Sequence, residues 1–509
     1  MADALTRKSS PRGKDPSNEP ITGVHGPLSG SYPAAVALVV CALVPYLTLS
    51  SAALPLATII ERSLHLSSAA FDLTVALSTG GYAVGTVVAV QFAVHRPARR
   101  MLLVYVTLFA IASLVAATAT SGTVFAVAFV VQGLCTSLML IAAVPPLVTG
   151  WPVPKMPMTG MVMNLCVFGA VAIGPTIGNL LASAHQWRLL FWCVAAVALL
   201  AVAMALLTFK DQPAQDKGAP FDLVANALAL GGCVAAFYGV GALEGGDRVR
   251  AWTIILMAAG VAMIFALVIH QFRMKNPLMP VRQLATTLPL MGIVIAMCVS
   301  AGAFGLMELS LSVLAKHSSP TKAAIVFLPE FVAALLTAAI FAALFKTRFT
   351  PILAFAGAAS LAAAALVLVH LPTESDTSIS IGAGLIGLGV GASVSPSLFI
   401  AGFSLRSSQI QRVFAFIELM RGVAAFLVAP ILLFVASDVG VVKGTGITVS
   451  VWICFALALA GGLGGIALFV SGGSGLQIPD LEGWQKGEPA WRSPRLAERF
   501  HDASRTGQT

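Results

Sequence analysis

Apolar runs of about twenty residues alternate with short polar connections along most of the chain. An α-helix needs a run of this length to cross the hydrocarbon core of a bilayer, because each residue advances it by about 1.5 Å. The pattern predicts fourteen membrane-spanning helices, and hence an all-α integral membrane protein. Their expected ranges are 33–56, 71–94, 101–119, 124–148, 159–184, 187–209, 221–242, 252–272, 288–315, 323–345, 351–371, 379–403, 413–436 and 448–470.

The basic residues indicate on which side of the membrane each connection lies. Most of the 30 Lys and Arg residues fall in the two tails and in the connections that follow even-numbered spans. Cytoplasmic connections carry the excess of Lys and Arg, so both termini are predicted to be cytoplasmic. A missed or added span would invert this bias further along the chain, so its consistency also supports the number fourteen.

Composition excludes several functional classes. With 58% hydrophobic and 10% charged residues, the chain is unlike a soluble protein, in which about a quarter of residues are charged. The net charge of +9 is scattered between apolar runs and forms no basic face, so no nucleic-acid partner is expected. The seven cysteines lie in apolar runs without a Cys-x-x-Cys pair, which predicts buried thiols and no disulfide. We expect no metal, no cofactor and no enzymatic activity.

The span 159–184 contains a distinctive motif. Gly174 and Gly178 are four residues apart, so they share one helix face and leave a groove where a second helix can approach closely. Pro175 removes a backbone donor and is expected to bend the helix. Gly-Pro-x-x-Gly, closed by Trp-Arg-x-x-Phe from position 187, resembles the fifth-helix antiporter motif of the major facilitator superfamily. It is most similar to that of the fourteen-span drug:proton antiporter branch.

Further motifs carry the same resemblance. They are Ser50-Ser-Ala-Ala-Leu-Pro55, the loop His95-Arg96-Pro-Ala-Arg99-Arg100, Gln132-Gly133, Gly387-Leu-Gly-Val-Gly391 and Arg421-Gly422. The resemblance implies two six-helix bundles, 33–209 and 288–470, around a central cavity, with 221–272 as an inserted helix pair. Residues 1–32 are predicted to be a disordered cytoplasmic tail. Residues 471–509 are predicted to be a cytoplasmic tail that is disordered or loosely docked.

The departures from the family pattern fall at its charged positions. Tyr46 stands where the first helix usually has an acid, and Phe129 stands where the fourth helix usually has its arginine. His95 replaces the aspartate of the loop motif, and Asn179 replaces the last glycine of the fifth-helix motif. The resemblance implies a gating role for the loop, which His95 would support only weakly.

Ionisable residues inside the spans are functional candidates, because placing one mid-bilayer costs roughly 2.5 to 3.5 kcal/mol. Glu418 and Arg421 are three residues apart and can form an ion pair on one helix face. Glu308 and Glu330 have no local partner. We expect Glu308 to be a cavity acid for protons or substrate, and Glu330 to be an interface acid that gates the outer side. The alternative for each is a protonated structural carboxyl or a side chain that reaches outward.

Asp72 and Asp222 lie at span ends and are assigned to helix capping. The remaining candidates for the cavity wall are weakly polar or aromatic side chains. They are Tyr46, Ser50, Phe129, Gln132, Asn164, Phe304 and Ser393. Such a wall suits a hydrophobic or amphipathic molecule better than a sugar, which needs many placed hydrogen bonds.

The predicted function is therefore secondary export of a hydrophobic or amphipathic small molecule across the inner membrane, in exchange for protons. The transporter is expected to be a monomer in the lipid bilayer, with a periplasmic adaptor protein as a candidate partner. Since the usual coupling residues are absent, the alternative is a relative that does not transport or is not coupled to protons, namely a facilitator or a sensor.

Overall fold

The computed structural model describes residues 27–208, 220–244, 251–371, 375–437 and 445–496. Within these ranges the chain is helical, with short 3-10 segments, one π-helical turn and no strand. The predicted disordered tail, residues 1–32, falls mainly within 1–26, outside the described residues.

Fourteen helical spans in the described ranges are long and apolar enough to cross a membrane, which confirms the predicted number. The first four are α1 (Tyr32–Leu64), α2 (Ser68–His95), α3 (Ala98–Thr118) and α4 (Gly122–Thr149). The fifth is composite and consists of η2 (Val153–Lys155), α5 (Met156–Asn164), η3 (Leu165–Gly169) and α6 (Ala170–Ser183). The sixth and seventh are α7 (Trp187–Thr208) and α8 (Leu223–Glu244). The others are α9 (Ala251–Arg273), α11 (Thr287–His317), α12 (Pro320–Leu344), α13 (Thr350–Val367), α14 (Asp376–Phe403), α15 (Ile410–Ala436), which follows η5 (Ser407–Gln409), and α16 (Gly446–Ser471). A spanning segment must satisfy its own backbone hydrogen bonds, and a continuous helix does so.

Several helices run past the predicted ranges. The first span was expected to end at residue 56, but α1 continues to Leu64. There His65 takes a left-handed conformation (φ 51°), and its backbone N–H bonds to the carbonyl oxygen of Glu61. Polar residues can extend a helix beyond its apolar run, so the apolar run marks the membrane-crossing part and not the helix end.

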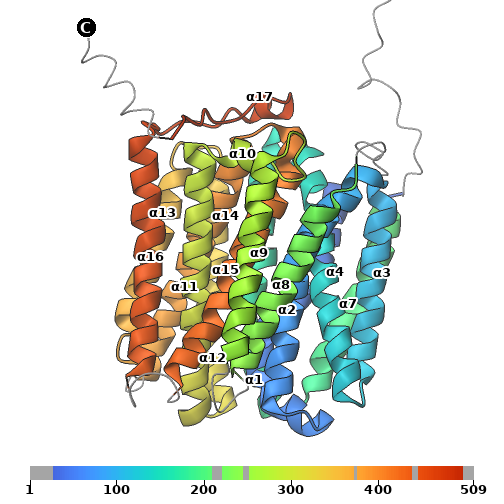
Figure 1. Ribbon diagram of the computed structural model, residues 1–509, viewed down its shortest axis with the longest axis vertical. Helices are drawn as coiled ribbons and strands as arrows, with labels where there is room; N and C mark the ends of the chain where they lie inside the picture. Colours follow the sequence, from blue (N-terminus) through green and yellow to red (C-terminus); the bar gives the residue numbers. More distant parts are fainter. Residues whose placement is uncertain (1–26, 209–219, 245–250, 372–374, 438–444, 497–509) are drawn as a thin grey trace, which may run out of the picture.

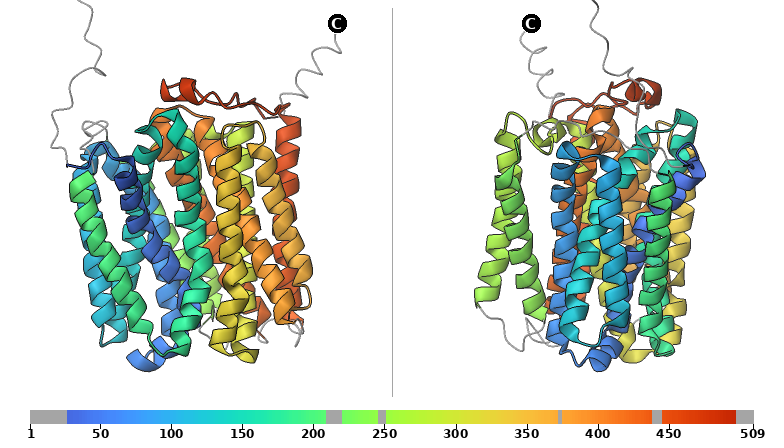
Figure 2. Two further views of the ribbon diagram at one scale, coloured as in Figure 1. Left: turned by 180° about the vertical axis from the view of Figure 1, so that it is seen from behind. Right: turned by 90° about the vertical axis from the view of Figure 1, so that its right-hand side faces the viewer.

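The spans form two halves and a separate hairpin. Helices α1–α7 pack together as the N-terminal half, and α11–α16 pack together as the C-terminal half (Figure 1). The halves meet where α2 packs on α15 and where α5 and α6 pack on α12. The α8–α9 hairpin lies to one side, against α2 and α15 (Figure 2). Helix α1 begins and α16 ends at one face, at the top of Figure 1, which we call the tail face; the other is the opposite face.

The C-terminal segment packs across the tail face. We call residues 472–496, which include the short helix α17 (Leu481–Gln485) and follow α16, the C-terminal strap. Trp484 is fully buried, its ring centroid lies 4.5 Å from that of Phe403, and its Nε1 donates to the carbonyl oxygen of Leu405 at 2.9 Å. Gln485 Nε2 donates to the carbonyl oxygen of Trp151, in the N-terminal half, at 2.6 Å. The prediction of a disordered or loosely docked tail is therefore wrong for 472–496; residues 497–509 lie outside the described ranges.

The prediction that all seven thiols are buried is also wrong. Cys193 on α7 is exposed and Cys298 on α11 is half-buried, whereas the other five are buried. In a membrane protein an apolar position can face either lipid or the protein interior, because both surroundings are apolar. Apolar sequence therefore does not by itself identify the core.

Candidate functional site

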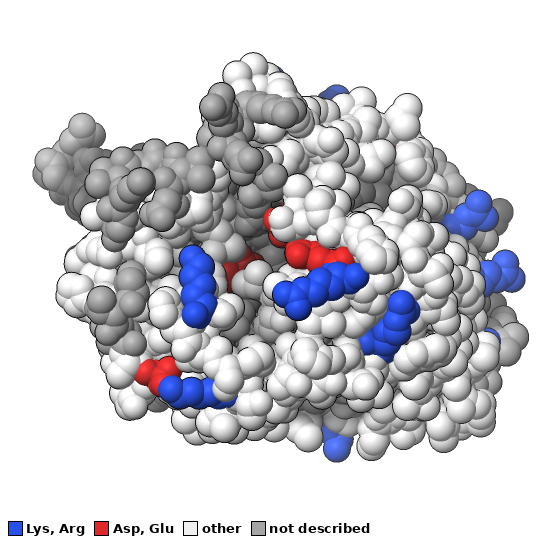
Figure 3. Space-filling model, turned by 90° about the horizontal axis from the view of Figure 1, so that it is seen from below, with Lys and Arg blue, Asp and Glu red and all other residues white. Residues whose placement is uncertain are grey.

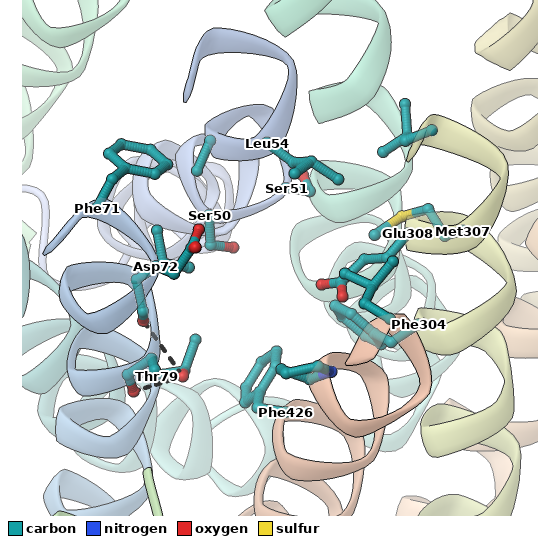
Figure 4. A pocket seen from close by; sticks show the side chains of 16 residues that line it. Ser50, Ser51, Leu54, Phe71, Asp72, Thr79, Phe304, Met307, Glu308 and Phe426 are labelled. Atoms are coloured by element: carbon teal, nitrogen blue, oxygen red, sulfur yellow. Dashed lines mark hydrogen bonds between the residues drawn. The ribbon is translucent and has the colours of Figure 1, made fainter. Parts of the chain in front are cut away.

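A cavity of about 80 Å³ lies between the two halves. Its walls come from α1 and α2 of the N-terminal half and from α11 and α15 of the C-terminal half (Figure 4). The lining residues fall late in α1, α11 and α15, which run from the tail face, and early in α2, which runs toward it. The cavity therefore occupies the part of the molecule nearer the opposite face, where Figure 3 shows a hollow.

Two carboxylates face this cavity from different halves. Asp72 on α2 and Glu308 on α11 both point into it (Figure 4). Both side chains are partly accessible, and no Lys or Arg is among the lining residues in the part of the chain that the structure describes. Acidic side chains lie in and beside the hollow of the opposite face, and Lys or Arg side chains lie on its rim (Figure 3). Among the described residues, the wall of the cavity thus carries two acids and no basic side chain, a setting that attracts protons or organic cations.

Asp72 was misassigned from the sequence. The helix cap is Ser67, whose side chain accepts a hydrogen bond from the backbone N–H of Ala70 at 3.2 Å. Asp72 lies about one turn further into α2, where its side chain is free to face the cavity. Ser67 before the apolar run was the available signal, since serine is as good a helix cap as aspartate. Asp222, by contrast, does accept a bond from the backbone N–H of Ala225 at 2.9 Å, which confirms the capping prediction there.

The residues predicted from the sequence to line the cavity divide into two groups. Ser50 and Phe304 line it. The other five do not, and the structure places them in packing between helices. They are Tyr46, Phe129, Gln132, Asn164 and Ser393.

Each of these five has a local packing or hydrogen-bonding role. The hydroxyl of Tyr46 bonds to Ser78 Oγ at 2.7 Å, and Ser78 Oγ in turn donates to the carbonyl oxygen of Phe129 at 2.8 Å. The other three side chains each donate a hydrogen bond: Gln132 Nε2 to Ser113 Oγ (2.9 Å), Asn164 Nδ2 to the carbonyl oxygen of Gly391 (2.9 Å) and Ser393 Oγ to the carbonyl oxygen of Gly389 (2.5 Å). A polar side chain in a span is satisfied by any nearby helix, so its presence alone does not identify a cavity wall.

Glu330 lies apart from the central cavity. It is 4% exposed and borders a separate void of about 20 Å³, room for about one water molecule. Phe168, on the fifth span, borders the same void, so Glu330 does lie where α12 meets the N-terminal half. Phe304 and Met307 border both the void and the central cavity and so separate them. Glu330 Oε2 has no hydrogen-bond partner among the described residues.

Glu418 and Arg421 form the predicted ion pair, and the pair is buried. Glu418 Oε2 accepts from Arg421 Nη2 at 2.5 Å and from Arg421 Nε at 3.2 Å. The same oxygen accepts from the hydroxyl of Tyr82, on α2, at 3.2 Å. The Arg421 guanidinium lies 5.5 Å from the ring centroid of Phe168. The pair therefore joins α15 to the N-terminal half.

The Gly-Pro motif holds α1 against α6. A Cβ added to Gly174 would overlap Ser51 Oγ and lie 2.6 Å from the carbonyl oxygen of Thr48. Because Pro175 has no N–H, the carbonyl of Val171 four residues earlier has no helical donor, and it accepts from Ser51 Oγ at 2.8 Å instead. The groove expected from the sequence is thus filled by α1. At Gly178 the added atom would lie 2.9 Å from the carbonyl oxygen of Ala52.

We expect Gly174→Ala to destabilise the protein by about 1–3 kcal/mol, because the added methyl group meets backbone atoms of α1 and the helices must separate. Thermal unfolding of the purified protein in detergent measures this as a lower Tm. The matched control is Gly464→Ala on α16, where the added Cβ would lie 3.6 Å from Val294 Cγ1, an ordinary contact. Equal Tm values for the two variants would show that the α1–α6 contact tolerates a methyl group.

The loop motif lies at the tail face near the start of α15. His95 Nδ1 lies 2.8 Å from the carbonyl oxygen of Gln91, and Arg99 Nη2 donates to the carbonyl oxygen of Leu206 at 2.9 Å. Arg96 borders a hollow shared with Gln411 of α15, whereas Arg100 is exposed. Gln411 Nε2 donates to the carbonyl oxygen of Ile141 on α4 at 3.0 Å. The two halves are therefore in contact on the tail side of the molecule, beside this motif.

Part of this chain is similar in sequence to known proteins. The Multidrug resistance protein B homolog of Mycobacterium tuberculosis is 28% identical over 180 residues, which cover 34% of this chain and 33% of that protein. The Lincomycin resistance protein LmrB of Bacillus subtilis is 25% identical over 186 residues, which cover 35% of this chain and 38% of that protein. Each match thus spans between 33% and 38% of the length of the relative.

The fold has a solved counterpart, and a family model matches most of the chain. The human organic anion transporter MFSD10 (TETRAN) superposes with a TM-score of 0.57 at 12% identity, over 86% of this chain and 99% of that one. That likeness concerns the fold alone. The family model described as Major Facilitator Superfamily matches residues 38–429, from the first span into α15. With fourteen apolar helices in its described ranges, arranged as two packed halves and a separate hairpin, this chain is a multi-pass membrane protein that belongs to the major facilitator superfamily of transporters.

Proposed function

We propose that this protein exports a hydrophobic or amphipathic small molecule in exchange for protons, by alternating access of the central cavity. The observation that carries the proposal is the pair Asp72 and Glu308, which face each other from different halves across a cavity whose described lining residues include no Lys or Arg. A carboxyl group that takes up a proton loses its charge. Proton uptake at this interface therefore changes the attraction of the cavity for a cationic substrate and the repulsion between the two halves.

The rest of the cavity wall supports an organic substrate. Phe71, Phe304 and Phe426 contribute aromatic rings, and Leu54 and Met307 contribute aliphatic surface. Ser50 and Ser51 on α1 and Thr79 on α2 add weakly polar groups. This wall offers stacking and apolar contact with few hydrogen bonds, which suits a lipophilic molecule.

The size of the cavity supports a moving interface. Drug-sized ligands occupy sites of about 300–1,000 Å³, several times the volume of this cavity. Substrate entry therefore requires the halves to separate, and we propose that α11 and α15 move relative to α1 and α2. On the tail side, the bonds of Glu418 to Tyr82 and of Gln411 to Ile141 would have to break when the cavity opens there.

The direction and location of transport are part of the proposal. Two relatives are named for multidrug and lincomycin resistance, which supports export of an organic compound. The basic residues of the sequence favour a cytoplasmic tail face, which supports an inner-membrane location with both termini inside. We propose a monomer whose two six-helix bundles, 33–209 and 288–470, are the moving units, with Glu330 as an interface acid and the His95–Arg100 loop as a gate.

The test is transport by the full-length protein in proteoliposomes that contain a pH-sensitive dye, with a panel of lipophilic cations, weak acids and neutral compounds. We expect a lipophilic cation to move against an imposed pH gradient and to cause proton movement in the other direction. Transport without proton movement would favour a facilitator. Binding of a compound that never crosses the membrane would favour a sensor.

A further inference from the structure

A polar hollow of about 680 Å³ lies at the tail face, between the C-terminal strap and the connection from α14 to α15. The segment before α11, which contains Gln283 and Thr286, completes its wall, and none of its described lining residues also lines the central cavity. Most of its lining side chains can donate hydrogen bonds. They are Gln283, Thr286, Ser404, Arg406, Gln409, Trp491, Arg492 and Ser493.

The two arginines give the hollow positive charge. Arg406 precedes η5, Arg492 lies on the strap, and both side chains are exposed. Neither guanidinium has a hydrogen bond or ion pair among the described residues, and no Asp or Glu is among the residues that line the hollow. Two guanidinium groups without a carboxylate partner make this a site for an anion.

The backbones that carry these arginines are held in place. The Trp484 indole donates to the carbonyl oxygen of Leu405, directly before Arg406. Gln477 brackets Arg492: its Nε2 donates to the Arg492 carbonyl oxygen at 3.1 Å, and its Oε1 accepts from the Arg492 N–H at 3.0 Å. Arg492 also follows Trp491, which is 4% exposed. Both arginines thus extend from fixed points, which lowers the entropy lost when they bind a ligand.

The rim of the hollow is tied to the start of α11. Ser493 Oγ donates to Thr286 Oγ1 at 2.9 Å and accepts from the backbone N–H of Leu288 at 3.0 Å. The strap, the α14–α15 connection and the start of α11 therefore meet around one opening. A ligand seated there would contact all three segments.

We propose that this hollow binds a phosphate-bearing anion between Arg406 and Arg492. The planar guanidinium fork matches the oxygens of a phosphate group, and charge-assisted bonds of this kind are about twice as strong as neutral ones. The surrounding amides and hydroxyls supply further donors. Two sources share this chemistry: the headgroup of an acidic phospholipid, available because the hollow lies at the end of the spans, and a soluble phosphate ester.

The test uses the purified full-length protein and measures bound anion by native mass spectrometry. One arm supplies phosphatidylglycerol, with phosphatidylcholine as the zwitterionic comparison, and the other supplies glycerol 3-phosphate. The double variant Arg406→Gln/Arg492→Gln removes the proposed site. The matched control is Arg273→Gln/Arg348→Gln, which removes two exposed arginines that lie at tail-face helix ends outside the hollow.

We expect the wild type and the control to retain one bound anion, and the Arg406→Gln/Arg492→Gln variant to bind it at least about tenfold more weakly. Retention of phosphatidylglycerol alone identifies a lipid headgroup, and binding of glycerol 3-phosphate identifies a soluble ligand; each supports the site. The proposal is overturned if neither compound binds the wild type, or if the Arg406→Gln/Arg492→Gln variant binds no more weakly than the control variant. Because these arginines are exposed, unchanged Tm values are expected and show that the variants are folded.

Discussion

Glu308→Gln is expected to reduce substrate-driven proton movement in proteoliposomes to the level of empty liposomes, a loss of more than about tenfold. Glutamine keeps the size and polarity of the side chain but cannot exchange a proton. Among the described lining residues, Glu308 is the acid that the C-terminal half contributes to the central cavity, and no second carboxyl of that half lies beside it there. The measurement is the pH-dye signal on substrate addition, at several imposed pH gradients.

The matched control is Glu482→Gln, an exposed acid on α17 at the tail face. It makes the same chemical change far from the cavity and should leave the signal unchanged. Proton movement that persists in the Glu308→Gln variant would remove Glu308 from the coupling mechanism. Asp72→Asn would then be the decisive variant, because Asp72 is the acid from the other half.

Glu418→Gln is expected to have the largest effect on stability, about 3–5 kcal/mol, because it leaves the Arg421 guanidinium buried without an anion. Arg421 is 2% exposed, and Glu418 is its one anionic partner among the described ion pairs. The Tyr82 hydroxyl would also lose a strong acceptor. The expected result is a large fall in Tm and in the yield of folded protein after detergent extraction.

A double variant distinguishes the effect of removing the whole ion pair from the effect of leaving the Arg421 charge buried without a partner. Glu418→Gln/Arg421→Met removes both charges and keeps much of the side-chain volume, so stability should return most of the way toward wild type. Size-exclusion profiles and Tm values of the single and double variants give the comparison. If the double variant is no more stable than Glu418→Gln, the ion pair is not what sustains this part of the α2–α15 contact.

Sequence reasoning about the spans succeeded because the controlling forces act locally. The bilayer sets the length of each apolar run, and the missing water inside it requires each run to be a helix. The Glu418–Arg421 pair was also predictable, since both residues belong to one helix face. The groove at Gly174 and Gly178 was expected, but which helix fills it was not visible in the local motif.

The site was less predictable because its residues meet through packing between distant helices. Asn164 bonds to the carbonyl of Gly391, a partner 227 positions away, so the sequence around Asn164 does not show that its side chain is already engaged. Asp72 was expected to cap α2, but the helix begins at Ser68, before Asp72. Trp484 and Trp491 lay in a polar, proline-rich tail, and their burial depends on Phe403, which belongs to α14.

Fourteen membrane-spanning helices and a resemblance to one transporter family can be read from the chain directly, because span length, hydrophobicity and the Gly-Pro motif are properties of contiguous residues. Which polar groups face a cavity and which serve packing depends on how distant helices pack together. Lipid and protein interior are equally apolar, so no local pattern separates the two. The pairing of Asp72 with Glu308 across the interface exists only because α2 and α11 come together around the same cavity.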